Sequence, residues 1–193
     1  KSFRGMYAVD HLNMTVPVGA IYGFIGENGS GKSTTEKLIT GHLVPDGGEI
    51  KLFGKDYTDP GVRARVGALI ENAGCFPGSS VYQNLMMQCI NLGLENPDEE
   101  IMRVLKIVRM EDNASLKFKS CSLGMKQRIG IAMALLGDPA LLILDEPTAA
   151  MGLRESHNTI SLLKKLKADG MGTTKGGKMT IAPTSALILA RVK

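Results

Sequence analysis

The stretch GENGSGKST, Gly26–Thr34, decides the fold of this chain because its residue types form a phosphate-binding loop directly behind an apolar run. Its three glycines let backbone N–H groups curl toward an anion, and a helix that follows points its positive end at the same place. We expect Lys32 to supply a mobile positive charge and Ser33 to supply a hydroxyl ligand for Mg²⁺. The stretch therefore predicts a site for a nucleoside triphosphate and its magnesium ion.

The residues on either side of this loop support the same interpretation. The run AIYGFI, Ala20–Ile25, predicts a strand, and GKSTTEKLITG predicts a helix that Gly41 can close. The alternative is a glycine-rich turn that matches the pattern by chance, for which average residue frequencies give roughly one in a hundred. A strand before the loop and a helix after it are the setting that the motif requires. The predicted phosphate-binding residues are Asn28, Gly29, Ser30, Gly31, Lys32, Ser33 and Thr34.

Length and composition indicate one soluble globular domain. A chain of 193 residues can bury one substantial core, so residues 1–193 are taken as a single domain. The net charge of +4 is mild, tryptophan is absent and no basic stripe appears, so we expect no nucleic-acid partner. The three cysteines form no CxxC pair, which fits a reducing cytosol. The apolar run at Ile129–Gly137 is far shorter than the ~20 residues of a membrane span.

The apolar patterns predict an α/β fold whose central sheet is parallel. AIYGFIG (Ala20–Gly26), RVGALIE (Arg65–Glu71) and ALLILDE (Ala140–Glu146) are nearly continuous apolar runs, as in parallel strands covered on both faces. The stretches Tyr7–Pro17 and Gly48–Gly54 resemble half-exposed strands, the first by its alternation of apolar and polar residues. They predict an antiparallel β edge beside the parallel sheet.

The period of the apolar residues changes between the second and third runs, and there it predicts an inserted α-helical subdomain at about 80–137. Within it, Ile101, Leu105 and Val108 fall on one helical face. Four methionines lie within the same segment, and we interpret them as adaptable core packing rather than as a cofactor site. The predicted helices contain VYQNLMMQCINLGL, PDEEIMRVLKIVRM and SLGMKQRIGIAMALLG, and the methionines are Met86, Met87, Met102 and Met110.

A second set of candidate site residues follows the third apolar run. Successive side chains of a strand point opposite ways, so Asp145 and Glu146 can have different roles at its end. We expect Asp145 to hold Mg²⁺ through its water shell, and Glu146 to polarise or position the attacking water. The alternative is a pair of solvated turn residues. About twenty residues earlier, Ser122–Arg128 (SLGMKQR) begins a helix with a hydroxyl and a glycine; taken alone, this is an N-cap with a basic face.

In this order, the motifs resemble those of the ATP-binding subunit of an ABC transporter, over nearly the whole chain. GENGSGKST corresponds to the Walker A loop, CSLGMKQR to the LSGGQ signature and LLILDEPT to Walker B. The resemblance implies a P-loop NTPase core that binds ATP and Mg²⁺ in a head-to-tail dimer. Ser122 and Gly124 of one subunit would close over the γ-phosphate that the other subunit's Lys32 holds. Phe3 lies where the family places an aromatic ring that stacks on adenine; Tyr7 is a substitute, and core packing is the alternative for either ring.

Glu71 stands where most members of this family have the glutamine of the Q-loop, a residue that contacts Mg²⁺. Together with SLGMKQR, it resembles the branch that exports bacitracin, lantibiotics and similar antimicrobial peptides. This resemblance implies an integral membrane permease as partner, a homodimer or heterodimer of ATP-binding subunits, and a cytoplasmic position, peripheral on the inner face of the cell membrane.

Two departures from the family pattern keep other functions open. After DEPT, the aspartate of the family's D-loop has no counterpart, and Ala186 occupies the position of the switch histidine. Both favour a nucleotide-binding regulatory module that hydrolyses ATP weakly. A soluble ABC protein of translation or DNA repair is a further alternative, although such proteins usually carry two cassettes or a long coiled-coil insert.

Overall fold

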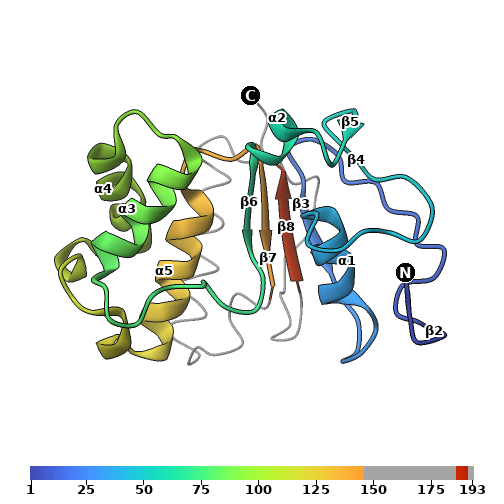
Figure 1. The fold of residues 1–193 in the computed structure, drawn as a ribbon, viewed down its shortest axis with the longest axis horizontal. Helices are drawn as coiled ribbons and strands as arrows, with labels where there is room; N and C mark the ends of the chain where they lie inside the picture. The colour runs from blue at the N-terminus through green and yellow to red at the C-terminus, as the bar shows by residue number, and fades with distance from the viewer. Residues whose placement is uncertain (146–185, 191–193) are drawn as a thin grey trace.

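The computed structural model describes residues 1–145 and 186–190, which form a four-stranded sheet with helices on either side (Figure 1). The helix α1 (Lys32–Ile39) lies on one side of this sheet, and a block of three helices lies on the other (Figure 1). The strands occur in the order β3 (Ile21–Phe24), β8 (Ala186–Ala190), β7 (Leu141–Leu144) and β6 (Val66–Leu69). Each of the three apolar runs therefore forms a strand, as predicted.

The directions of these strands are only partly those that the sequence predicts. β6 and β7 pair in parallel, with Leu69 opposite Leu144. β8 pairs antiparallel with both β3 and β7, so β3, β6 and β7 all point the same way. The three strands predicted from the apolar runs therefore share one direction, as predicted, whereas β8 runs against them and makes the sheet mixed. An apolar run specifies that a strand is buried, but parallel and antiparallel ladders both satisfy its backbone groups.

The antiparallel β edge consists of two short ladders outside the main sheet. β1 (Ser2–Phe3) pairs with β2 (Met6–Tyr7), and β4 (Lys51–Leu52) pairs with β5 (Lys55–Asp56).

The strand predicted for Tyr7–Pro17 does not form beyond Tyr7. The N–H groups of Ala8 and Val9 both donate to the carbonyl of Lys1, at 3.0 and 3.1 Å, so they are not available to an extended ladder. His11 has φ +42°, which also interrupts an extended chain. The alternation of residue types therefore predicted too long a strand, because the backbone N–H groups after Tyr7 donate to a turn instead of to a β ladder.

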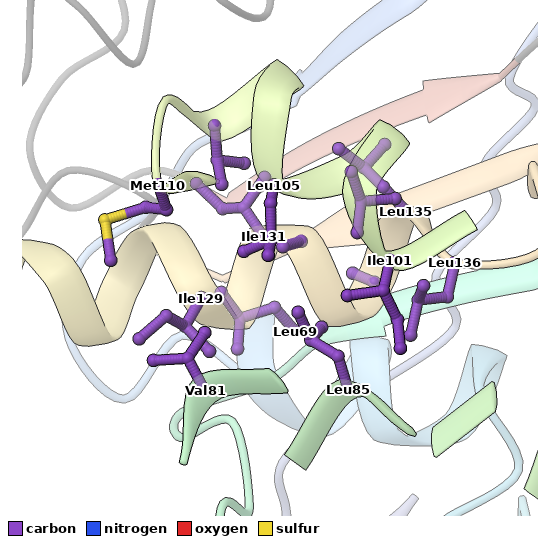
Figure 2. Close-up of a cluster of buried hydrophobic side chains, with 14 of the residues drawn as sticks. Leu69, Val81, Leu85, Ile101, Leu105, Met110, Ile129, Ile131, Leu135 and Leu136 are labelled. Atoms are coloured by element: carbon purple, nitrogen blue, oxygen red, sulfur yellow. The ribbon is translucent and has the colours of Figure 1, made fainter. Parts of the chain in front are cut away.

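The helical block consists of α3 (Val81–Leu92), α4 (Pro97–Val108) and α5 (Leu123–Leu135), as the period of the apolar residues predicts. Figure 2 shows buried side chains of α3, α4 and α5 in one cluster, and each of these helices contacts the other two. Ile101, Leu105 and Val108 are all buried in this core. No helix within the described residues is long and apolar enough to cross a membrane. In the part of the chain that the structure describes, the remaining helices are α2 (Pro60–Arg63) and two 3₁₀ turns, Glu111–Asn113 and Phe118–Ser120.

The methionines of the helical block differ in environment. Met110 is buried in the core, and Met86 packs against it from a partly buried position. These two fit the interpretation as adaptable packing. Met102 is 48% exposed and lies at the surface instead.

Two side chains of α4 cap the end of α5. Arg103 Nη2 donates to the carbonyl of Leu135 at 3.0 Å, and Glu100 Oε1 accepts from the N–H of Gly137 at 2.8 Å. Arg103 also donates to both carboxylate oxygens of Glu100, at 2.6 and 2.7 Å. Carbonyl groups in the last turn of a helix have no partner within it, so this contact supplies one and joins α4 to α5.

We predict that this cap makes the stability of the fold depend on pH. The hydrogen bond from Arg103 holds the pKa of Glu100 below its ordinary value of 4.5, against the opposing effect of burial. Such a carboxyl stabilises the fold above its unfolded pKa and loses this contribution as pH falls through its folded pKa. Arg103→Ala should therefore lower the free energy of unfolding by ~1 kcal/mol near neutral pH, and by less as pH falls below 4.5.

Urea unfolding of both forms between pH 3.5 and 7 measures this difference. The matched control is Lys51→Ala, which removes one member of the exposed Glu49–Lys51 pair and should leave stability nearly unchanged. A loss on Arg103→Ala that is the same at every pH would contradict the role given to Glu100.

Candidate functional site

The predicted phosphate loop joins the end of β3 to the start of α1, in the strand–loop–helix arrangement that the motif requires. Gly31 precedes α1 with φ +88°, and a Cβ there would lie 2.1 Å from the carbonyl oxygen of Ala8. A Cβ on Gly26 would lie 2.5 Å from Ser30 Oγ. The backbone contact and the positive φ explain why glycine occupies position 31, whereas a larger residue at position 26 would first have to move the Ser30 hydroxyl.

Lys32 is the first residue of α1, and its side chain lies across the loop. Its Nζ donates to the carbonyl oxygens of Gly26 at 2.7 Å and Glu27 at 2.9 Å, and the residue is only 7% exposed. Both acceptors are neutral carbonyl groups, so they do not compensate the charge of the Lys32 ammonium group. This charge adds to the positive end of the helix dipole. The loop therefore combines a buried ammonium group with a helix N-terminus, an arrangement suited to an anion.

Ser33 and Asp145 meet beside this loop although 112 residues separate them in the sequence. Ser33 Oγ donates to Asp145 Oδ2 at 3.0 Å. The strand β7 before Asp145 is buried throughout, and the N–H of Asp145 donates to the carbonyl of Leu69 at 2.8 Å. Asp145 is thus fixed at the carboxyl ends of β6 and β7.

This pair of oxygen ligands fits Mg²⁺. Mg²⁺ is a hard cation that usually takes one or two carboxylates from the protein and fills its other positions with water and phosphate oxygens. Within residues 1–145, no group of three or more histidine, cysteine, aspartate or glutamate side chains could hold a metal. A hydroxyl and one carboxylate beside a phosphate loop therefore suit a magnesium ion that arrives with a nucleotide.

Glu71, the other predicted magnesium ligand, lies two residues beyond β6 and pairs with Lys37 of α1. The distance from Lys37 Nζ to Glu71 Oε1 is 2.6 Å, and the Glu71 side chain is 59% exposed. The motifs do not indicate Lys37 as a site residue. Its position four residues after Ser33 could have done so, because this spacing places both on one face of a helix.

Ser122 and Gly124 lie at the start of α5. Ser122 Oγ accepts from the N–H of Met125 at 3.2 Å, so Ser122 is the N-cap that its residue type predicts, and it is exposed. Gly124 is buried in the first turn of the helix. The helix N-terminus accordingly presents an exposed hydroxyl and the positive end of its dipole at the surface.

The predicted adenine-stacking residue lies in the short β1 strand. The Phe3 ring is 44% exposed and belongs to neither buried cluster of the described residues, which disfavours core packing as its role. Lys1 Nζ lies 5.6 Å from the centre of this ring. Tyr7 in β2 is more exposed still.

Three of the predicted features involve residues after Asp145. Glu146 and the segment where the D-loop aspartate was expected lie outside the described residues. Ala186 is the first residue of β8 and pairs with Phe24, the last residue of β3. The backbone pairing thus places Ala186 beside the carboxyl end of β3, where the chain continues into the phosphate loop.

Comparison with known proteins identifies the relatives of this chain. The family model described as ABC transporter matches residues 9–149. The bacitracin transport ATP-binding protein of Bacillus licheniformis is 38% identical over 170 residues, which cover 86% of this chain and 55% of that protein. The lantibiotic transport ATP-binding protein of Streptococcus pyogenes is 33% identical over 171 residues, or 89% of this chain and 73% of that protein. The chain thus spans little more than half the length of the bacitracin relative.

A solved structure shares the fold. An ATP-binding cassette, solved as a dimer in a post-hydrolysis state with ADP and Pi, matches with a TM-score of 0.74 and 26% identity. The match covers 85% of this chain and 76% of that one. The α/β fold with its phosphate loop is therefore the fold of an ATP-binding cassette.

Proposed function

Since this chain belongs to the ABC transporter family, we propose that it binds ATP with Mg²⁺ and hydrolyses it at a dimer interface to drive a separate membrane permease. The observation that carries the proposal is the hydrogen bond between Ser33 and Asp145, beside the buried Lys32. It joins the phosphate loop to the carboxyl end of β7, where a nucleotide-bound magnesium ion needs its ligands. The proposal takes residues 1–193 as one ATP-binding domain with a helical subdomain at about 80–137.

The phosphate groups of ATP would lie in the loop from Asn28 to Thr34. The N–H groups of Gly29, Ser30, Gly31 and Thr34 would bind phosphate oxygens, and the ammonium group of Lys32 would exchange its two carbonyl acceptors for phosphate oxygens. Ser33 would bind the magnesium ion directly, with Asp145 acting through water and Glu71 as a third oxygen ligand. Mg²⁺ supplies charge neutralisation for the phosphates when it is bound.

Substitution of Lys32 tests this site. Lys32→Ala should weaken ATP affinity at least tenfold, because a charge-assisted hydrogen bond is worth roughly 1.5–3 kcal/mol. Calorimetry with a non-hydrolysed ATP analogue measures the affinity without turnover. Lys106→Ala, at the exposed end of α4, is the matched control and should bind as the unaltered chain does. Equal affinity of the Lys32→Ala and unaltered forms would refute the site.

The shared site would be completed by a second subunit. The exposed Ser122 at the N-terminus of α5, with the N–H groups beside the buried Gly124, suits the γ-phosphate of a nucleotide held by the partner. The half-exposed ring of Phe3 suits stacking on adenine. Glu146 is proposed as the residue that positions the attacking water.

We infer that the partner is an integral membrane permease and that the chain acts in the cytoplasm, peripheral on the inner face of the membrane. The relatives named for bacitracin and lantibiotic transport support export of an antimicrobial peptide as the driven process. Co-purification of a membrane protein from detergent extracts, with the stoichiometry of the complex, tests the partner and separates a homodimer from a heterodimer. A chain that hydrolyses ATP but never purifies with a membrane protein would support a soluble role instead.

A further inference from the structure

Two side chains of α1, one helical turn apart, each bind an acidic residue at the carboxyl end of a different strand. Ser33 binds Asp145, which follows β7, and Lys37 binds Glu71, which follows β6. The two strands are neighbours, with Leu69 paired to Leu144, and the N–H of Asp145 donates to Leu69 O at 2.8 Å. Because residues i and i+4 share a helix face, the Lys37–Glu71 pair lies beside the Ser33–Asp145 pair.

The backbone at Glu71 holds its carboxylate on this face. Glu71 has φ +61°, and the N–H of Asn72 donates to the carbonyl of Ile70 at 2.8 Å across it. This is a γ-turn with positive φ, a rare and strained turn for a residue other than glycine. Strain of this kind persists only where the surroundings hold it, and Lys37 binds the Glu71 side chain.

The Lys37–Glu71 ion pair is also weak enough for another cation to replace Lys37 at the Glu71 carboxylate. The Lys37 and Glu71 side chains are 34% and 59% exposed, and water screens a pair with this exposure strongly. A divalent cation close to the same carboxylate offers a larger charge than one ammonium group. The Glu71 carboxylate is therefore positioned where Lys37 and a magnesium ion at Ser33 and Asp145 can compete for it.

We propose that Lys37 is a positioning residue that holds Glu71 away from the magnesium ion until nucleotide binds, and so sets the magnesium concentration that binding requires. The inference rests on the proposed function, since it assumes that Mg²⁺ arrives with ATP beside Ser33. Lys37 acts only through Glu71, and it needs no contact with the nucleotide. Release of Glu71 from Lys37 also frees the turn at Ile70–Asn72 from α1, which links nucleotide binding to the segment after β6.

The test is a magnesium titration of nucleotide binding, with a fluorescent ATP analogue and no turnover. Lys37→Met keeps an unbranched side chain of similar length and removes its charge, so Glu71 is released from the ion pair. The magnesium midpoint, which is the Mg²⁺ concentration that gives half-maximal nucleotide binding, should then fall about two- to fivefold. Lys37→Arg keeps the charge and should keep the original midpoint. Affinity measured in EDTA should be the same for all forms, because Lys32 and the loop N–H groups are unchanged.

A double-mutant cycle separates positioning from a general effect of charge. Loss of any lysine near the site removes a positive charge that repels Mg²⁺, and so favours magnesium binding. That general effect would persist when Glu71 is replaced by glutamine. If Lys37 acts through Glu71, Lys37→Met should shift the midpoint in the unaltered chain and not in the Glu71→Gln background. Equal shifts in both backgrounds, or no shift in either, would overturn the proposal.

The same data distinguish failure of this inference from failure of the proposed function. If the unaltered chain binds no ATP, or binds it independently of Mg²⁺, the proposed function is wrong. If it binds ATP with a clear magnesium midpoint that Lys37→Met leaves in place, only the role of Lys37 is wrong. Thermal unfolding in EDTA checks that the Lys37 variants are folded before either conclusion is drawn.

Discussion

Replacement of Glu146 by glutamine is expected to slow ATP hydrolysis by ~10²-fold or more while it leaves ATP affinity largely intact. Glutamine keeps the size and hydrogen-bonding shape of glutamate but cannot take a proton from the attacking water. Asp145, joined directly to Glu146, is held by Ser33 and by the carbonyl of Leu69, so the loop and the magnesium ligands are unaltered. The loss should therefore fall on the chemical step, and an ATP-bound dimer should accumulate.

Two measurements on Glu146→Gln check this result. Phosphate release at saturating MgATP gives the rate, and light scattering with size-exclusion chromatography gives the proportion of dimer. Glu49→Gln is the matched control because it makes the same chemical change at an exposed residue, which pairs with Lys51. A Glu146→Gln form that stays monomeric at high MgATP and high protein concentration would remove the main support for a shared site.

Substitution of Ala186 by histidine is expected to raise ATP turnover. The family resemblance implies a histidine at this position, which would donate a hydrogen bond to the γ-phosphate and help to place the attacking water, contacts that matter most in the transition state. A methyl group cannot do this, and the loss of one such contact costs about 1.5–3 kcal/mol, or roughly a 10- to 150-fold slower step. Ala186 pairs with Phe24 at the end of β3, next to the phosphate loop, so Ala186→His should restore part of this rate.

The pairing of β8 provides a control on the same strand. Ala190 is also alanine but pairs with Leu141, at the opposite end of the sheet, four residues or ~13 Å along the strand. Ala190→His should therefore leave turnover unchanged. Family-like turnover by the Ala186 form, with no gain from histidine, would show that this position does not correspond to the switch histidine. Phosphate release for the three forms at saturating MgATP makes the comparison.

The sequence alone determined those features whose cause lies within a few residues. The glycine at position 31 follows from the close approach of the Ala8 carbonyl and from a positive φ, and a pattern of residue types can reflect that requirement. The buried faces of α3, α4 and α5 follow from the 3.6-residue period, and Ser122 is an N-cap because its hydroxyl reaches the N–H of Met125. The residue types and their spacing also predict Lys32, Ser33 and Asp145 as site residues, and that role stays a prediction.

Only the tertiary structure decided which distant residues meet and in which direction strands run. The bond from Ser33 to Asp145 and the pair of Lys37 with Glu71 join segments that no local pattern connects. The antiparallel direction of β8 could not be predicted, because its apolar residues would suit either direction. The strand β2 ends at Tyr7 because the N–H groups of the next two residues donate to the carbonyl of Lys1. Local sequence fixes which groups are available, whereas long-range backbone hydrogen bonds and packing fix where those groups are brought together.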